Sequence, residues 1–443
     1  MKNIFIFLFI VCGLITQAQT NTLSLDGALQ KAYQQKSSVA NANLDGSISN
    51  ESARATKGQY LPQVTANAEM RLNAIRQTSI IPGEVSNRPG TTIPVQFGTV
   101  WQNTAGVTVT QKLYDGANLS QQLADAIQTK IANNAVEKNK QTVAYEVSKA
   151  YYQALWYTSR VVNFQIDYNR KLAVENLIND KQENGRALIT EVTEAKIATA
   201  NAKVALSNAL RNVVLAKQYL LFQIGTDTTG GGALKLSNTL LEMGQTLTTN
   251  SNLGGAKERP EITEQALNEE LAITNAKVER KRKGPTLSMV GYLGAQGFDD
   301  NWGKSLDITN NWYGNSYIGL QAAMPLFNGF DTETKVKKQL LKQQQSSNIR
   351  KELTQNFAYE SALAQSAQTQ AFENWQVKKS NAQLARQSVQ LVTLRAQEGR
   401  ATTRETLDAN ATLSETETQE IEAFYNYLIA ALDLAKANGT LVK

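Results

Sequence analysis

Four acidic residues are the side chains in this sequence whose type and spacing most directly suggest a function. Glu191 and Glu194 follow one Gly-Arg-Ala motif, and Glu405 and Asp408 follow a second. Carboxylates three residues apart lie on the same face of a helix. The chain contains no histidine to work with them in acid–base catalysis. Several such pairs around an opening would instead attract cations and repel one another.

The two motifs are Gly185-Arg186-Ala187 and Gly399-Arg400-Ala401. Glycine tolerates the left-handed conformation that ends a helix, so each motif predicts a sharp turn between two helices. The arginines of both motifs, together with Arg404, are close enough in sequence to the carboxylates to act as counter-charges. We therefore expect them to hold the two turns in a closed arrangement.

The motifs belong to an internal duplication. The stretch from Gly185 to Gly225 has a second copy of equal length from Gly399 to Gly439. In the first copy, apolar and small residues recur in alternating steps of four and three between Leu188 and Leu220, which is typical of a coiled-coil helix. So long a repeat indicates two copies of one large unit and not a solenoid of small repeats. Each copy is expected to contain a long antiparallel helical hairpin.

The duplication divides the sequence into four segments. Residues 1–18 are predicted to be a secretory signal peptide, because a basic start and an apolar run precede the small residue Ala18. Residues 19–225 and 259–443 are predicted to be the two structural repeats, each with a helix, two strands and a helical hairpin. Residues 226–258, rich in Gly, Ser, Thr and Asn, are expected to connect them.

Each repeat contains two segments in which apolar and polar residues alternate, which predicts four strands of about ten residues. They lie near residues 63–72, 104–113, 286–296 and 318–326. The segments 79–99 and 299–314, rich in polar and turn-forming residues, are predicted to be loops between the paired strands. The expected fold is therefore mainly α, with a small β part.

The strands raise the question of a membrane. Beyond residue 20, no apolar run approaches the ~18 residues that a membrane helix needs. If the chain spans a membrane, it must use a closed β-barrel, which four strands are too few to form. Three copies would supply a shared barrel of twelve strands. The alternative is a soluble hairpin sheet capping a coiled coil.

Composition argues against several other functions. The chain has no histidine, and its only cysteine, Cys12, lies in the predicted signal peptide. Gly230-Gly231-Gly232 lacks the lysine of a phosphate-binding loop. We expect no cofactor, no metal site and no enzymatic activity. The net charge of +6 is modest for 443 residues, so nucleic acid is not an expected partner.

The order of helix, two strands and long hairpin, repeated once, resembles the TolC family of trimeric outer-membrane efflux channels. The segments that carry the resemblance are Leu23-Ser24-Leu25-Asp26-Gly27-Ala28-Leu29, Tyr60-Leu61-Pro62, Arg259-Pro260-Glu261, Tyr425-Asn426-Tyr427-Leu428-Ile429 and Gly439-Thr440-Leu441. The resemblance implies a homotrimer in the outer membrane of a Gram-negative bacterium, with a twelve-stranded barrel and a periplasmic α-barrel. It also implies docking to a periplasmic adaptor and an inner-membrane pump, in drug efflux, metal efflux or type I secretion.

In this family, acidic residues of the last hairpin form the pore constriction. The resemblance places that role on Glu405 and Asp408, with Glu191 at the matching acidic position of the first hairpin. We assign Glu194, three residues further on, to the same constriction. It also implies that the Gly-Arg-Ala tips contact the adaptor, with six near-equivalent sites in a trimer. Ala396 and Ala401 differ from the residues usual at their positions in the family. A periplasmic coiled-coil structural or adaptor protein without a pore remains the alternative function.

Overall fold

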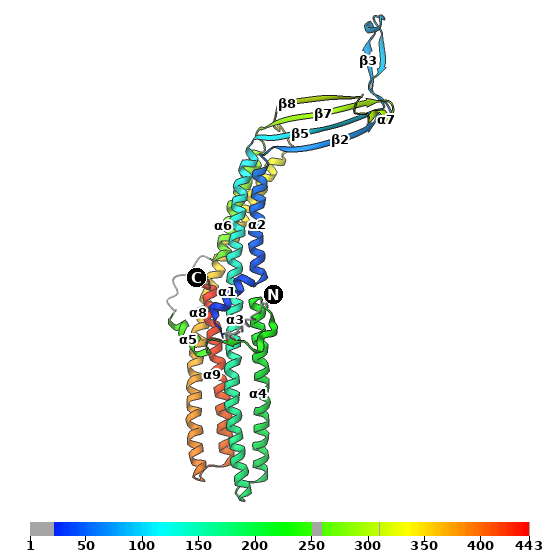
Figure 1. Cartoon of the computed structure of the whole chain (residues 1–443). Helices are drawn as coiled ribbons and strands as arrows, with labels where there is room; N and C mark the ends of the chain where they lie inside the picture. Colours follow the sequence, from blue (N-terminus) through cyan, green and yellow to red (C-terminus); the bar gives the residue numbers. More distant parts are fainter. Residues whose placement is uncertain (1–21, 250–258, 310, 443) are drawn as a thin grey trace, which may run out of the picture. The chain divides into compact units, whose positions relative to one another are not determined.

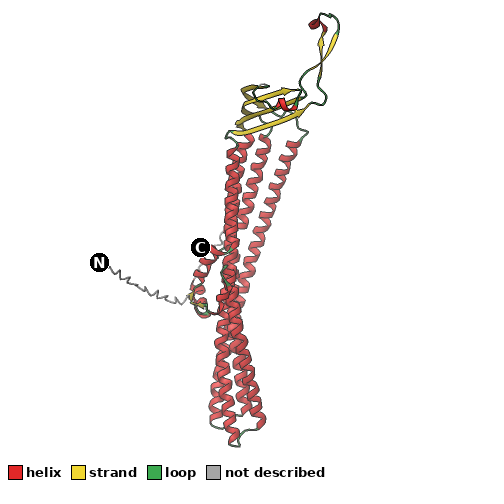
Figure 2. Cartoon of the chain, turned by 45° about the vertical axis from the view of Figure 1, so that its right-hand side comes forward, coloured by secondary structure: helices red, strands yellow, loops and turns green. Residues whose placement is uncertain are grey.

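The computed structural model describes residues 22–249, 259–309 and 311–442. The predicted signal peptide, residues 1–18, lies outside the described residues, as do residues 250–258 of the predicted connector. The fold is mainly helical with a smaller strand part, which confirms the fold class expected from the sequence (Figures 1 and 2).

The chain forms two compact units, and each unit takes segments from both predicted repeats. Among the described residues, the helical unit consists of 22–41, 137–249, 259 and 354–442. The strand unit consists of Ala42–Val136 and Pro260–Leu353. The long helices α3, Gly116–Glu183, and α8, Asp331–Gln397, contribute residues to both units.

The remaining helices are shorter than α3 and α8. They are α1 (Leu25–Gln35), α2 (Ser37–Gly58), α4 (Ile189–Ile224), α5 (Leu240–Thr249), α6 (Pro260–Lys281) and α9 (Thr403–Ala437). The pairs α3/α4 and α8/α9 are the two predicted hairpins, and their turns lie at the same end of the helical unit (Figures 1 and 2). No helix within the described residues combines the length and apolar character needed to cross a membrane.

The coiled-coil pattern predicted for the first hairpin matches the buried face of α4. The buried positions fall on the predicted seam, with steps of three, four or seven, at Val192, Ala195, Thr199, Ala202, Ala209, Ala216 and Leu220. Small residues dominate this face, so neighbouring helices can approach closely. The seam predicted from the sequence is confirmed at these positions, whereas Leu206 and Val213 are only half-buried and Leu188 is exposed at the start of the helix.

The core of the helical unit is centred on Tyr151 of α3. Its ring is fully buried together with Leu220 of α4 and Leu428 of α9. The Tyr151 hydroxyl lies 3.0 Å from the carbonyl oxygen of Leu23 and 3.2 Å from the side-chain oxygen of Asn238. Leu23 is the last residue of one short strand and Asn238 follows another. The buried hydroxyl therefore fixes both strand segments against the helices.

Those short strands are a parallel pair, β1 (Thr22–Leu23) and β6 (Lys235–Leu236). The sequence offers Ser24 and Asp26 as candidates to cap the first helix, and after β1 it is the Ser24 side chain that caps α1, by accepting a hydrogen bond from the Gly27 N–H over 3.1 Å. The sequence predicts one helix before the first two strands, and this prediction is wrong, because the backbone is extended at Lys36 and divides the helix into α1 and α2. The Lys36 ammonium pairs with Glu146 of α3 over 2.5 Å.

Gly225 lies against this break. It ends α4 with φ +86°, and a Cβ added there would be 3.1 Å from Lys36 Cα. We expect Gly225→Ala to lower the free energy of unfolding by about 2 kcal/mol, because it combines a left-handed backbone with a close approach. Thermal unfolding in detergent measures this. The control is Gly230→Ala, where an added Cβ meets nothing within 4 Å; equal effects of the two variants would contradict the prediction.

The strand unit contains a four-stranded antiparallel sheet with the order β2-β5-β7-β8. Its strands are β2 (Gln63–Leu72), β5 (Trp101–Asp115), β7 (Thr286–Asp299) and β8 (Trp312–Ala323). All four were predicted from their alternating pattern, although β5 and β7 are longer than expected. A register shift between Lys112 and Tyr114 interrupts the pairing of β5 with β7.

The sheet is open on both faces and at both edges within the part of the chain that the structure describes. Every residue of β2 is exposed, and nearly every residue of β8 is exposed. Neither of these strands has a hydrogen-bonded neighbour on its outer side among the described residues. Apolar side chains such as Val64, Ile318 and Leu320 therefore lie in contact with solvent in the single chain.

Two predicted loops contain secondary structure. Segment 79–99 includes most of a hairpin, β3 (Thr78–Pro82) and β4 (Thr92–Gln96), joined by the 3₁₀ turn η1 (Gly83–Ser86). Its prolines and glycines obscured the short alternation of isoleucine and valine, and a two-stranded ribbon tolerates Pro94. Segment 299–314 contains the short helix α7 (Trp302–Ser305), whose Ser305 accepts hydrogen bonds from the buried Asn103 of β5.

The predicted connector also contains ordered elements, the 3₁₀ turn η2 (Thr228–Gly232), β6 and α5. Part of this segment packs on the helical unit, because Leu240 and Met243 of α5 join the core around Tyr151. The repeat boundaries at 225 and 259 remain predictions.

Candidate functional site

The two Gly-Arg-Ala motifs form the turns of the two helical hairpins. Gly185 has φ +70° and Gly399 has φ +74°, so both adopt the left-handed conformation that the sequence predicts. The next N–H bonds back into the ending helix in both turns, from Arg186 to the Lys181 oxygen and from Arg400 to the Arg395 oxygen, each over 2.7 Å. The duplicated sequence thus gives two turns with the same hydrogen-bond pattern.

Glu405 and Glu191 each cap the helix that leaves their turn. The Glu405 carboxylate accepts a hydrogen bond from the Thr402 N–H over 2.8 Å, and the Thr402 hydroxyl accepts one from the Glu405 N–H over 3.2 Å. Glu191 accepts from the Leu188 N–H over 2.8 Å, although leucine cannot return the bond. The second hairpin therefore has a full capping box and the first has half of one.

The same hydrogen bonds set the ionisation of Glu405. Donation from Thr402 to the carboxylate, first from its N–H and then from its hydroxyl, holds the pKa of Glu405 below its ordinary value of 4.5. The carboxylate is exposed, and the desolvation that opposes its charge is smaller than the effect of these hydrogen bonds. It is consequently ionised at neutral and at mildly acidic pH.

The remaining charged residues of the two turns are exposed or weakly paired. Arg404 lies 3.9 Å from Asp408, one turn further along α9. Arg400 pairs with Glu398 over 3.3 Å. In the described part of the chain, no ion pair joins an arginine of either motif to Glu191, Glu194 or Glu405. The counter-charge arrangement expected from the sequence is therefore found only between Arg404 and Asp408, and its effect on closure stays a prediction.

The first turn also has an apolar support. Ala187 packs with Val174 against a buried cluster of Ile178, Val192 and Ala195. This cluster joins the last turns of α3 to the first turns of α4. The Ala187 side chain of this Gly-Arg-Ala motif is thus packed against the helices, whereas the Arg186 side chain is exposed to solvent.

A network of six charges inside the helical unit was not predicted from the sequence. On α3, Asp167 lies 3.6 Å from Arg170 and 3.0 Å from Lys171. Arg170 reaches across to Glu417 of α9 over 2.8 Å. Arg386 of α8 contacts Glu417 over 3.1 Å and Glu420 over 3.0 Å. Three helices are therefore joined by three cations and three carboxylates.

The sequence contains only part of the signal for this network. Asp167, Arg170 and Lys171 have the three- and four-residue spacings of pairs along one helix, which usually lie on the surface. Their partner Glu417 is far away in sequence. It can be recognised as a partner only from the packing of α3, α8 and α9. Asp167 and Glu417 are largely buried, which distinguishes them from ordinary surface pairs.

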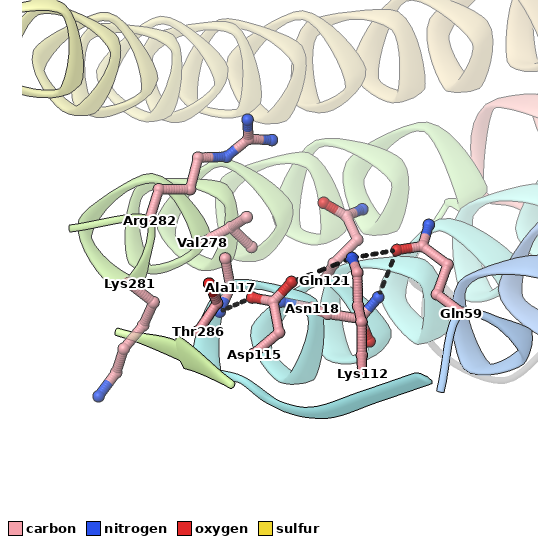
Figure 3. Close-up of a pocket in the computed structure, with 10 residues that line it drawn as sticks. All are labelled: Gln59, Lys112, Asp115, Ala117, Asn118, Gln121, Val278, Lys281, Arg282 and Thr286. Atoms are coloured by element: carbon pink, nitrogen blue, oxygen red, sulfur yellow. Dashed lines mark hydrogen bonds and ion pairs between the residues drawn. The ribbon is translucent and has the colours of Figure 1, made fainter. Parts of the chain in front are cut away.

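A polar hollow of about 330 Å³ lies in the strand unit, where β5 passes into α3 (Figure 3). Lys112 donates to the Asp115 carboxylate over 3.3 Å and to the Gln59 side-chain oxygen over 3.1 Å. Asp115 also accepts from the N–H groups of Ala117 and Asn118 and so caps α3. The polar groups that line the hollow thus form hydrogen bonds with one another. Their role is to connect strand β5 to the adjoining helices. Across the described residues, no group of histidine, cysteine and acidic side chains could hold a metal ion.

Comparison with known proteins gives one family. The family described as outer membrane efflux protein matches residues 28–226 and 256–440, which are most of the chain. No curated protein matches the sequence closely enough to count as a relative.

Solved structures share the fold at low sequence identity. The outer membrane protein VceC from Vibrio cholerae is 17% identical, with 94% of this chain and 96% of that chain covered and a TM-score of 0.68. The CmeC outer membrane channel of Campylobacter jejuni is 14% identical, with 95% and 86% covered and a TM-score of 0.69. The MtrE outer membrane channel of Neisseria gonorrhoeae, in its open state, is 17% identical, with 94% and 89% covered and a TM-score of 0.69.

Proposed function

We propose, because the chain belongs to the outer membrane efflux protein family, that it forms the exit duct of a tripartite efflux or type I secretion system. In this role, three copies form one tube in the outer membrane with a periplasmic extension. The tube conducts solutes passively from a periplasmic adaptor and an inner-membrane pump to the exterior. The pump and its adaptor select the cargo.

The open sheet is the observation that carries this proposal. Strands β2 and β8 present two long unpaired edges within the described residues, and apolar side chains are exposed between them. Unpaired backbone groups are not tolerated in lipid, so a membrane-inserted sheet must close on itself. With four strands per copy, three copies give a twelve-stranded barrel, which is within the known range.

The helices also present exposed large apolar side chains. On α4 these include Ile197, Val204, Leu215 and Phe222, and on α8 they include Leu363, Val377, Leu384 and Leu391. A water-soluble single chain rarely exposes so many large apolar side chains along its helices. Lateral packing against neighbouring copies would cover them and form the wall of a helical tunnel.

The acidic residues at the hairpin turns fit a constriction in such a tunnel. Glu405, Asp408, Glu191 and Glu194 all lie within the first two turns of α4 or α9, at the end where both hairpins reverse (Figure 1). Three copies would bring twelve carboxylates to this end. We assign the exposed Gly-Arg-Ala turns to adaptor contact and the acidic residues to the pore, with no catalytic residue in either place.

Purification from native membranes tests the proposal. We expect the protein in the outer-membrane fraction as a trimer that resists detergent until it is heated, and cation-preferring conductance after addition to a planar bilayer. The control is a periplasmic marker protein released by osmotic shock. Release of this protein with the marker, as a monomer without conductance, would support the pore-free coiled-coil alternative and overturn the proposal.

A further inference from the structure

The turn that joins β8 to α8 displays large apolar side chains to solvent. In this segment, residues 325–330, called the aromatic turn below, Leu326 is 92% exposed, Phe327 is 77% exposed and Phe330 is 66% exposed. The two phenylalanine rings meet edge to face, with their centroids 5.6 Å apart. They pack on each other, and most of their surface remains uncovered.

The backbone of the aromatic turn is strained at Phe330. This residue has φ +64°, directly after Gly329 with φ +63°. Bulky residues rarely adopt the left-handed conformation, because their Cβ approaches the backbone too closely. Such strain persists only where something else maintains it, and it concentrates at functional positions. The covering contact that would offset it is missing from the described part of the single chain.

The duplicated sequence contains an internal comparison. The turn from β5 to α3, called the inner turn below, reads Leu113-Tyr114-Asp115-Gly116-Ala117. The aromatic turn reads Leu326-Phe327-Asn328-Gly329-Phe330. At the β5 turn, Leu113 and Tyr114 are about half as exposed as Leu326 and Phe327, at 45% and 46%. The backbone there enters the helix without strain. Strand β5 has sheet neighbours on both sides, whereas β8 is an edge strand. Of these two turns, the one at the edge of the sheet therefore has the more exposed ring.

A hollow lies at the opposite edge of the same sheet. It has a volume of about 460 Å³ and is lined by Glu51, Arg54, Ala55, Lys57, Gly58 and Leu61, where α2 ends before β2. Gly58 and Ala55 leave the space open, and an added Cβ at Gly58 would meet nothing within 4 Å. Leu61 is exposed beside it and gives the hollow an apolar wall.

The two features lie at the same end of the sheet. Following the backbone pairs across it, Gln63 of β2 is opposite Thr110, Thr110 is opposite Val290, and Val290 is opposite Gly319 of β8. The start of β2 and the end of β8 are thus at one level, and the strands run in opposite directions. In a closed ring of copies, the β8 edge of one copy meets the β2 edge of the next, with the aromatic turn beside the hollow.

We infer that the aromatic turn of one copy docks into the hollow at the end of α2 of the neighbouring copy. The occupant is a second copy of this chain, because the edge strands that flank both features need the same partner. The docked rings cover the exposed apolar surface and offset the strain at Phe330. This inference rests on the proposed trimer and adds the contact that locks its sheet edges in place.

Disulfide formation between copies tests the contact. The chain has no cysteine after Cys12, which lies in the predicted signal peptide, so introduced cysteines have no competitor in the mature protein. We expect the double variant Leu326→Cys with Gly58→Cys to give covalently linked dimers and trimers after mild oxidation. The matched control is Leu113→Cys with Gly58→Cys, which uses the equivalent leucine of the inner turn and should give no product between copies.

Light scattering of the unoxidised protein separates failure of the docking from failure of the trimer. Trimers that form the linked product support the inference. Trimers that remain unlinked show that the turn faces lipid or solvent, and they overturn the docking while the proposed function stands. A monomer overturns both.

A second variant gives a reading that does not depend on cysteine chemistry. Phe330→Gly removes the ring and also relieves the backbone strain, so it should not impair folding of the single chain. We expect detergent-resistant trimers of this variant to dissociate at a clearly lower temperature, whereas Tyr114→Ala at the inner turn leaves that temperature unchanged. An unchanged dissociation temperature for Phe330→Gly would contradict the docking.

Discussion

Replacing Glu417 with alanine is expected to lower the free energy of unfolding by about 3 kcal/mol. Glu417 is 12% exposed and accepts hydrogen bonds from Arg170 on α3 and Arg386 on α8. Removing it leaves Arg170, itself 20% exposed, with Asp167 at 3.6 Å as its nearest counter-charge. Breaking a buried pair by deleting one partner typically costs 3–5 kcal/mol, and partial exposure favours the lower end.

The size of this effect comes from one excess positive charge, because the three cations of the network are left with only Asp167 and Glu420 as partners. The Glu417→Gln variant keeps the shape and one oxygen acceptor but removes the charge, so we expect an intermediate loss. The control is Glu415→Ala on the same helix, where the side chain is exposed and contacts Gln419. Urea unfolding followed by circular dichroism measures all three variants. Similar losses for the Glu417 and Glu415 alanine variants would show that the network contributes no more than a surface pair.

Local patterns in the sequence were sufficient for most of the fold. The seam of α4 was predictable because its buried positions repeat within one helix, and Ser24 was predictable as a cap because capping acts within three residues. The four strands were predictable because alternation survives even in a sheet whose faces are uncovered. In contrast, the break at Lys36 depends on Glu146 and Gly225, which lie far away in sequence.

The candidate site was predictable in type but not in detail. The duplication identified both turns and their acidic residues. It did not show that Glu405 and Glu191 cap helices, although Thr402 three residues before Glu405 is a capping-box spacing that could have been noticed. The Arg170–Glu417 contact could not have been found, because it depends on how two helices of different repeats pack.

Neutralising Glu405 and Asp408 together is expected to remove most of the cation preference of the open channel. The variant Glu405→Gln with Asp408→Asn takes two negative charges from each copy, and therefore six from the proposed trimer. Rings of carboxylates select cations in narrow pores through their local field. Reversal potentials in a salt gradient across a planar bilayer measure the preference.

The capping geometry makes this variant a clean test of charge. Glutamine also completes a capping box, so Glu405→Gln keeps the start of α9 intact. Asp408→Asn removes only the exposed 3.9 Å contact with Arg404, which contributes little to stability. The control is Glu398→Gln at the end of α8, an exposed carboxylate near the same turn that pairs with Arg400. Equal selectivity of the double variant and the unmodified channel would place these residues outside the constriction.

The pH dependence of the unmodified channel gives the same assignment an independent check. Because hydrogen bonds from Thr402 hold the pKa of Glu405 below 4.5, the carboxylate stays charged as the pH falls from 7 towards 5. Cation preference should therefore persist over that range and decline only at lower pH, as Glu405 takes up a proton. The same protonation weakens the cap of α9, whose stabilisation is present above the ordinary pKa and is lost as the pH falls through the lowered one. A channel that loses its preference already between pH 7 and 6 must owe it to other groups.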